Sequence, residues 1–233
     1  MSLAILQELK ALADPDQARI LQRFFKTGKG EYGEGDVFLG IRMPALRALS
    51  KKYEIPPLIE LRTLLDSRYH EARMLALLFL MRSYRASHDD TTRKEVVDFY
   101  LANTARINNW DLVDISCRDI VGVHLLDKSR KLLYRLAKSK NLWEQRIAII
   151  STWTFIKHHE FDDTLALSEK LLTHPHDLMH KAVGWMLREV GKKNPAVLRA
   201  FLDQHRLQMP RTMLRYAIEH FPEKTRKIYL ARR

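Results

Sequence analysis

The stretch Asn109-Trp110-Asp111-Leu112-Val113-Asp114 continues into residues 115–122 and has the pattern of a single helix. Asn109 is a favourable N-cap residue, an acidic side chain follows in the first turn, and apolar residues recur at helical spacing. Trp110 and Asp114 are four residues apart, so their side chains project from the same face of the helix. The carboxylate at position 114 matters because the equivalent positions of neighbouring segments are basic.

Weakly similar segments of helical pattern recur along the chain and begin at Arg73, Asp114, Arg146, Lys181 and Arg215. Their first residues are 41, 32, 35 and 34 positions apart. Two-helix repeats with periods in this range are typical of α-solenoids of the HEAT type. We therefore predict an all-α fold of about a dozen helices, an α-solenoid of HEAT-like two-helix repeats. It should curve around a concave basic groove and form a single domain over residues 1–233.

Capping residues, prolines and polar breaks divide the chain into helices, and no convincing strand pattern interrupts them. The predicted helices lie near residues 3–13, 15–26, 45–53, a segment opened by Pro56-Pro57, 71–85, 91–104, 109–126, 128–138, 142–158, 161–173, 177–193, 195–204, 211–220 and 222–230. Residues 27–36 hold four of the eight glycines and form a loop. That loop is either a flexible connection or an approach to a ligand.

The charge of the chain favours a polyanionic partner. Its 233 residues include 40 Lys and Arg against 28 Asp and Glu, which gives a net charge of +12. Residues 181–233 contribute +9 of this charge and end with Arg232 and Arg233. Such an excess favours nucleic acid first and an anionic membrane surface second. A basic protein without such a partner is the alternative.

The single cysteine, Cys117, excludes an internal disulfide and fits a reducing compartment. No apolar run approaches the roughly 20 residues of a membrane span, and the N-terminus lacks the pattern of a secretory signal. We expect a cytoplasmic, DNA-associated monomer that has no contact with a membrane.

Equivalent helices of a solenoid line one wall, so the first residues of the repeats should form a row. That row contains four cations and one acid: Arg73, Arg146, Lys181, Arg215 and Asp114. The cations suit a DNA backbone, because each phosphate contact releases condensed counterions. Alternatively, they are solvated or structurally paired charges.

Asp114 would repel a DNA backbone, which favours a chemical role over a purely binding one. When an N-glycosidic bond breaks, the deoxyribose gains oxocarbenium character, and a fixed carboxylate stabilises that charge or orients the attacking water. Removing such a group typically costs on the order of 100–1000-fold in rate. The plainer alternative is a salt bridge from Asp114 to Arg118 or Arg146.

Two tryptophans add to this picture. Trp110 shares the face of Asp114, and Trp185 lies four residues after Lys181 on its own helix. Indole faces attract cations by about 0.5–2 kcal/mol, and an alkylated purine carries a positive charge. The two side chains could therefore wall a site for a damaged base, although core packing would explain them equally well.

Four blocks make the chain resemble the AlkD-type DNA alkylation repair glycosylases, which are built from HEAT-like repeats. The blocks are Phe38-Leu39-Gly40-Ile41-Arg42-Met43-Pro44, Trp110-Asp111-Leu112-Val113-Asp114, Trp143-Glu144-Gln145-Arg146-Ile147-Ala148 and Lys181-Ala182-Val183-Gly184-Trp185-Met186-Leu187-Arg188-Glu189. The resemblance covers nearly the whole chain, and the order and spacing of the four blocks make it specific.

The resemblance implies excision of N3- and N7-alkylated purines without a metal or other cofactor. It assigns the catalytic carboxylate to Asp114 and the lesion-site aromatic residues to Trp110 and Trp185. It also implies lesion contacts for Arg42 and for Tyr32 in the glycine-rich loop. A cationic base is already a good leaving group, so one carboxylate suffices where glycoside hydrolysis usually needs two. Members are thought to act on the sugar rather than to flip the base into a deep pocket.

The expected partner is double-stranded DNA containing alkylated bases. The resemblance implies that Arg146 contacts this DNA, and the basic row together with the last block extends the expectation to Arg73, Lys181, Arg188 and Arg215. These contacts would hold phosphates while the chemistry takes place at the sugar.

Two other functions are compatible with the sequence, a non-catalytic HEAT-repeat module for branched or distorted DNA and a protein–protein scaffold. A paralogue without catalysis would be expected to lose the Trp/Asp pair, which this chain keeps. A scaffold predicts an exposed apolar groove, which the cations disfavour.

A cluster of His174, His176, His180 and Asp177 lacks the Glu of a His-Glu-x-x-His motif, so we predict no metal site there.

Overall fold

The computed structural model describes residues 1–231, and Arg232 and Arg233 lie outside the described part. Within residues 1–231 the chain has fourteen α-helices and no strand, apart from an isolated bridge between Val37 and Tyr69. The predicted all-α fold is therefore confirmed, and the succession of packed helices is consistent with an α-solenoid. No helix in this described range has the length and apolar character needed to cross a membrane. The chain forms two compact units, Met1–Ser116 and Cys117–Arg233.

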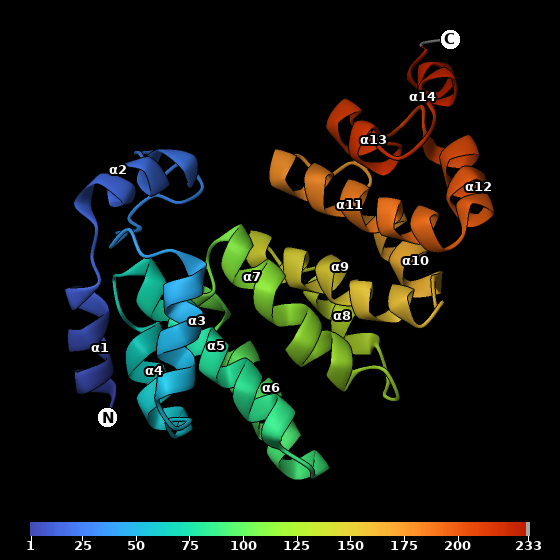
Figure 1. Cartoon of the computed structure of the whole chain (residues 1–233). Helices are drawn as coiled ribbons and strands as arrows, with labels where there is room; N and C mark the ends of the chain where they lie inside the picture. The colour runs from blue at the N-terminus through green and yellow to red at the C-terminus, as the bar shows by residue number, and fades with distance from the viewer. Residues whose placement is uncertain (232–233) are drawn as a thin grey trace. The chain divides into compact units, whose positions relative to one another are not determined.

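The first unit is built around α5, which packs against α3, α4 and α6 (Figure 1). Side chains from His70 to Met81 on this helix are buried, as expected for a helix that is apolar on most sides. The elements of this unit are α1 (Ser2–Ala11), α2 (Pro15–Phe24), α3 (Met43–Lys52), α4 (Leu58–Leu65), α5 (His70–Ala86), α6 (Asp90–Ala102), the 3-10 helix η1 (Thr104–Arg106) and α7 (Trp110–Cys117), whose last residue begins the second unit.

The second unit is built around α9 and α11, which pack against each other. Its elements are η2 (Arg118–Gly122), α8 (Lys131–Leu136), α9 (Leu142–Lys157), α10 (Asp162–Lys170), α11 (Asp177–Lys193), α12 (Pro195–His205), α13 (Arg211–Ala217) and α14 (Glu223–Leu230). Helices α8 and α10 cover α9, while α12 and α13 cover α11. Gly184 allows α11 and α13 to approach closely, since a Cβ at this position would lie 2.5 Å from the backbone oxygen of Met213.

Side-chain caps explain several helix starts. Asp14 accepts hydrogen bonds from the backbone N–H groups of Asp16 and Gln17, both at 3.0 Å, directly before Pro15. Asn194 does the same at the start of α12, where Pro195 occupies the first position. Proline suits this position because its missing N–H would have no partner within the helix. The breaks predicted from these residues are therefore found where the sequence places them.

The predicted helix over residues 109–126 contains an irregularity that the sequence did not indicate. Helix α7 ends at Cys117, whose side chain is fully buried, and residues 118–122 form a π-helix. Helical geometry resumes at residues 123 and 124. Such π-helical segments are rare and occur often at functional sites.

Candidate active site

Helix α7 carries Trp110 at its first position and Asp114 one turn later. Both residues are partly exposed. Asn109, just before the helix, is buried; its Oδ1 accepts a hydrogen bond from the Trp110 N–H at 2.8 Å, and its carbonyl accepts one from the Val113 N–H at 3.2 Å. The helix therefore starts as predicted, and the Asp114 side chain is not sealed inside the core.

An aromatic stack supports Trp110. The indole is stacked on Phe25, with ring centres 5.1 Å apart and planes inclined by 19°. Phe25 stacks on Phe38 at 4.9 Å, and Phe38 stacks on the imidazole of His70 at 4.3 Å. Each aromatic pair of this kind contributes about 0.5–1.5 kcal/mol beyond the area that it buries. The position of Trp110 is thus fixed by packing, although the residue stays partly exposed.

Phe24 is an aromatic neighbour of Trp110 that the sequence analysis did not single out. Its ring lies edge-on to Trp110, with centres 5.9 Å apart, and the residue is 61% exposed. The adjacent Phe25 is buried. Consecutive helical residues project about 100° apart, so two adjacent phenylalanines in the sequence indicate that one of the two rings points away from the core.

Tyr32, our predicted lesion contact, lies partly exposed in the loop that follows α2.

A buried ionic cluster adjoins the first turn of α7. His70 on α5 has Nε2 2.8 Å from Asp111 Oδ2 and Nδ1 3.1 Å from Asp36 Oδ2. Arg73 and Asn109 also donate hydrogen bonds to the Asp36 carboxylate, the latter at 3.2 Å. All of these residues except Asp111 are at most 5% exposed. The buried charges therefore compensate one another, as charges out of contact with water must.

The cluster keeps His70 protonated. Burial alone would lower the pKa of this imidazole, but the Asp111 and Asp36 carboxylates outweigh burial and raise the pKa of His70 to about 9. Burial also opposes ionisation of Asp36, yet the hydrogen bond from His70 and the charge of Arg73 hold the pKa of that carboxyl below its ordinary value. At neutral pH, the His70 imidazolium thus lies between the two carboxylates, while Arg73 pairs with Asp36.

Two arginines that we predicted to contact DNA are buried. Arg73 is 5% exposed and donates to Asp36. Arg146 on α9 is 4% exposed, and its Nη1 donates to the backbone carbonyl of Leu178 at the start of α11, at 2.7 Å. The sequence analysis placed both in the basic row of the repeats, with solvated or structurally paired charges as the alternative. The structure gives each guanidinium a structural partner, and a phosphate contact by either stays a prediction.

The other predicted DNA contacts of the second unit lie nearer the surface. Lys181 is partly exposed and pairs with Asp177 at 2.7 Å. Arg188 lies on the same helix, α11, and pairs with Glu219. Arg215, on α13, is exposed. Of these three cations, Arg215 is the one most open to a phosphate.

Arg42 lies at the start of α3 and is exposed, with its guanidinium donating to Gln17 Oε1 at 2.9 Å. The segment before it is fixed by Glu71, whose buried carboxylate accepts hydrogen bonds from the backbone N–H groups of residues 39–41 at 2.8–3.2 Å. Residues 38–44, one of the blocks on which the family resemblance rests, therefore form a turn that Glu71 holds against α5.

Trp185 on α11 already contacts a cation of the chain. The guanidinium carbon of Arg118 lies 5.9 Å from the centre of the Trp185 ring and 4.5 Å from that of Trp153. Trp185 is partly exposed, and its Nε1–H donates to Glu189 at 3.1 Å. The ring of Trp185 can therefore accept a positively charged group within its own unit.

The three histidines near residue 177 order the turn before α11. His174 Nε2 lies 2.8 Å from Gln145 Oε1, and the Nδ1 atom of His176 accepts from the backbone N–H of Leu178 at 3.1 Å. Burial lowers the pKa of His174 and of His176. Over residues 1–231, no three His, Cys, Asp or Glu side chains are grouped so as to hold a metal ion.

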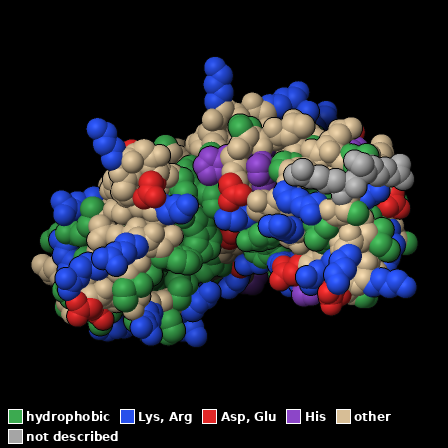
Figure 2. All heavy atoms as spheres, turned by 90° about the horizontal axis from the view of Figure 1, so that it is seen from above, with side chains coloured by type: hydrophobic (Ala, Val, Ile, Leu, Met, Phe, Trp, Pro, Cys, Tyr) green, Lys and Arg blue, Asp and Glu red, His purple; other side chains and the backbone are tan. Residues whose placement is uncertain are grey.

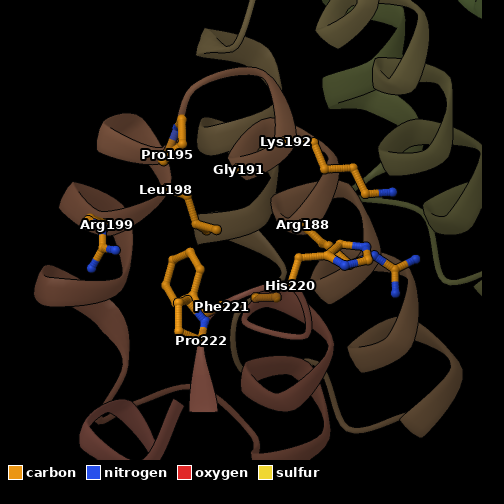
Figure 3. Close-up of a pocket in the computed structure, with 10 residues that line it drawn as sticks. Arg188, Gly191, Lys192, Pro195, Leu198, Arg199, His220, Phe221 and Pro222 are labelled. Atoms are coloured by element: carbon orange, nitrogen blue, oxygen red, sulfur yellow. The ribbon is translucent and has the colours of Figure 1, made fainter. Parts of the chain in front are cut away.

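A cavity of about 220 Å³ lies in the second unit, where α11, α12 and the α13–α14 connection meet (Figure 3). Leu198 and Phe221 point toward its centre, and Arg199 lies over the Phe221 ring at 4.8 Å. The lining residues are Arg188, Gly191, Lys192, Pro195, Leu198, Arg199, Ala217, His220, Phe221 and Pro222. Arg188 is the one predicted site residue in this lining.

The residues predicted for the site thus fall into two groups. Trp110, Asp114, Tyr32 and Arg42 belong to the first unit, and Trp185 belongs to the second. Within the first unit, the structure brings Trp110 and Asp114 together on α7 and anchors the start of that helix through Asp111.

Comparison with known proteins gives a family match and matches among solved structures. A family model described as DNA alkylation repair enzyme matches residues 5–221. Among solved structures, the chain is similar to a predicted DNA alkylation repair enzyme from Enterococcus faecalis, with a TM-score of 0.69 and 20% sequence identity over 91% of this chain and 97% of that chain. At this level of identity the structural similarity shows a shared fold. No curated protein matches the chain.

Proposed function

The chain belongs to the DNA alkylation repair enzyme family, and on this premise we propose that it is a DNA glycosylase for positively charged alkylated purines. The observation that carries the proposal is the placement of Asp114, which is partly exposed one turn after Trp110 on a helix anchored at its start. A carboxylate held in this way is preorganised for a charge that develops in the transition state.

In the proposed reaction, the bond between the deoxyribose C1′ and the purine nitrogen breaks, and its electron pair goes to the base. The base leaves as a neutral molecule because alkylation had given it a positive charge, so no general acid is needed. The positive charge passes to the sugar, where the Asp114 carboxylate stabilises it. Water then adds at C1′ and loses a proton, which leaves an abasic site. The substrates would be DNA containing N3-methyladenine or N7-methylguanine.

Lesion recognition is assigned to the aromatic residues. Trp110 would offer a ring face or edge beside Asp114, and the exposed Phe24 would extend that surface. Trp185 would contribute a second indole, whose attraction for a cation is illustrated by Arg118. Tyr32 and Arg42 would complete the contacts, with the exposed Arg42 guanidinium suited to the phosphate of the damaged nucleotide.

DNA binding is assigned to the exposed cations. Lys and Arg side chains are spread widely over the face shown in Figure 2, in keeping with the net charge of +12. Arg215, Lys181 and Arg188 would contact phosphates, and each contact would release counterions. Because Arg73 and Arg146 are buried, the proposal does not depend on them.

The wider organisation follows from the same proposal. We infer that both compact units serve one DNA-binding domain of HEAT-like repeats, acting as a monomer on double-stranded DNA in the cytoplasm. The packing of successive helices within each unit supports the repeat organisation.

The decisive experiment measures the release of 7-methylguanine and 3-methyladenine from methylated duplex DNA. We expect Asp114→Asn to slow release by on the order of 100–1000-fold while binding to DNA that carries an abasic-site analogue is retained. Asp98→Asn is the matched control, since it removes an exposed carboxylate of α6 in the same unit and should leave the rate unchanged.

The alternative function is a non-catalytic module that binds branched or distorted DNA. The same assay separates the two, because binding without release of any base by the wild-type protein would support the module. Equal release by wild type and Asp114→Asn would leave a glycosylase but remove Asp114 from its mechanism.

A further inference from the structure

We propose that His70 is the positioning residue for the reaction, holding the first turn of α7 so that Asp114 and Trp110 keep their places. The inference rests on the proposed function, which gives those two side chains their roles. His70 belongs to α5 and acts on α7 from outside, through Asp111 and through the aromatic stack.

The first tether is ionic. His70 Nε2 lies 2.8 Å from Asp111 Oδ2, and Nδ1 lies 3.1 Å from Asp36 Oδ2. His70 and Asp36 are each 3% exposed at their side chains, whereas Asp111 is 18% exposed. Hydrogen bonds between ionised groups are short and strong when water is excluded. The cluster therefore links the second residue of α7 to α5 and to the loop that carries Asp36.

The second tether is the stack of rings. The imidazole of His70 supports Phe38, which supports Phe25, which supports the indole of Trp110. Trp110 and Asp111 project about 100° apart around the helix axis. Two tethers in different directions resist rotation of the first turn as well as its displacement. Asp114 lies one turn after Trp110 on nearly the same face of the helix. A rotation of the first turn of α7 would therefore displace the Asp114 carboxylate.

The protonation state of His70 decides whether its ring can donate a hydrogen bond to both carboxylates. A charged imidazolium has an N–H on each nitrogen, but a neutral imidazole has one and presents a lone pair on the other side. The charged groups that face the ring are Asp36 from the loop, Asp111 from α7 and Arg73 from α5 itself. When the charge is lost, Asp111 is the carboxylate that can turn to water, because it is the more exposed. Loss of the proton should therefore loosen α7.

The test uses two variants of His70 whose side-chain amides lie at different distances from the backbone. In His70→Gln, the side-chain amide can still donate to Asp111, whereas in His70→Asn it reaches only toward Asp36. We expect the single-turnover rate of 7-methylguanine release to fall about 10-fold with Gln and about 100-fold with Asn, since small misplacements of a catalytic group cost this much. DNA affinity should change little, because none of the residues proposed to contact phosphates is altered. His205→Gln is the control, a buried histidine of α12 whose ring centre lies 4.5 Å from that of Phe201.

The pH profile gives a readout that a purely structural residue would not move. The wild-type rate, corrected for release from DNA without protein, should fall as the pH rises through about 9, following the pKa of His70. His70→Gln and His70→Asn should lack this fall, since an amide does not titrate. Asp111→Asn should move it to lower pH, because Asp111 raises the pKa of His70.

Hydrogen exchange of the free protein gives a readout that needs no activity. Amides of residues 110–114 should exchange faster in His70→Asn than in His70→Gln, and slowest in wild type. If wild type releases no base, the proposed function fails, and the exchange rates alone decide whether His70 holds α7. Unchanged exchange in His70→Asn, or a wild-type pH profile in all three variants, would overturn the positioning role. Should His70→Asn not fold, Asp111→Asn decides by its pH profile and its exchange.

Discussion

A Cβ atom on Gly40 would lie 2.1 Å from the backbone oxygen of Asp14, which is far shorter than a van der Waals contact. Gly40 also has φ of +86°, a conformation that L side chains rarely adopt. We expect Gly40→Ala to lower the free energy of unfolding by about 2–4 kcal/mol, because both the backbone conformation and the close approach are lost. Urea denaturation followed by circular dichroism measures this change.

Gly30→Ala provides the control for that measurement. Gly30 has φ of +79°, but a Cβ there would meet no atom within 4 Å. Only the conformational cost of about 1–2 kcal/mol should appear. If the two variants lose the same stability, the close approach to Asp14 contributes nothing and the explanation for Gly40 is wrong.

Stability should depend on pH through His70. Its pKa in the folded protein is about 9, above the ordinary 6.5, so the folded state holds the proton more tightly. The resulting stabilisation, of order 3 kcal/mol at most, is complete below pH 6.5 and is lost as the pH rises through 9. Urea unfolding of wild type at pH 6 and pH 10 should show this loss. In His70→Gln the difference between the two pH values should be smaller by a similar amount.

Trp110 should contribute to lesion binding through its ring rather than through its size alone. Trp110→Phe keeps a ring that can stack on Phe25, whereas Trp110→Ala removes it. With a cation–π contribution of about 1–2 kcal/mol, we expect kcat/KM for 7-methylguanine release to fall about 10-fold or more with Ala and less with Phe. Equal values for the two variants would argue that stacking at this position is irrelevant to recognition.

Two arginines should respond oppositely to removal. Arg215→Ala should weaken DNA binding of any sequence and reduce the slope of log affinity against log salt by about one, without loss of stability. Arg146→Ala should instead reduce stability by about 1–3 kcal/mol, because the Leu178 carbonyl loses its buried donor. Salt-dependent fluorescence anisotropy and urea denaturation of both variants separate the effects. An intact fold with weakened binding in Arg146→Ala would restore this residue to the DNA interface.

The positions of the helices were predictable from sequence because their causes are local. Asp14 and Asn194, each followed by proline, cap helices within three residues of themselves, and apolar periodicity marks the buried faces. Helix ends depend on a few neighbouring residues, so a linear reading is sufficient for them.

The support of the site was not predictable, because its causes lie far apart in the chain. His70 is 34 residues from Asp36 and 41 from Asp111, and nothing in the local pattern around any of them indicates the others. The burial of Arg73 was not predicted for the same reason, since it depends on Asp36. Asp114 was singled out because a carboxylate in a row of basic residues is visible in the sequence alone, whereas the anchoring of its helix is not.

The lone thiol of the chain is fully enclosed at the end of α7. Methylating agents that damage DNA are electrophiles, and an accessible thiolate is among the nucleophiles that they attack most readily. A repair protein of this kind works where such reagents are present. With Cys117 out of reach, the protein should survive the chemical exposure that creates its own substrate.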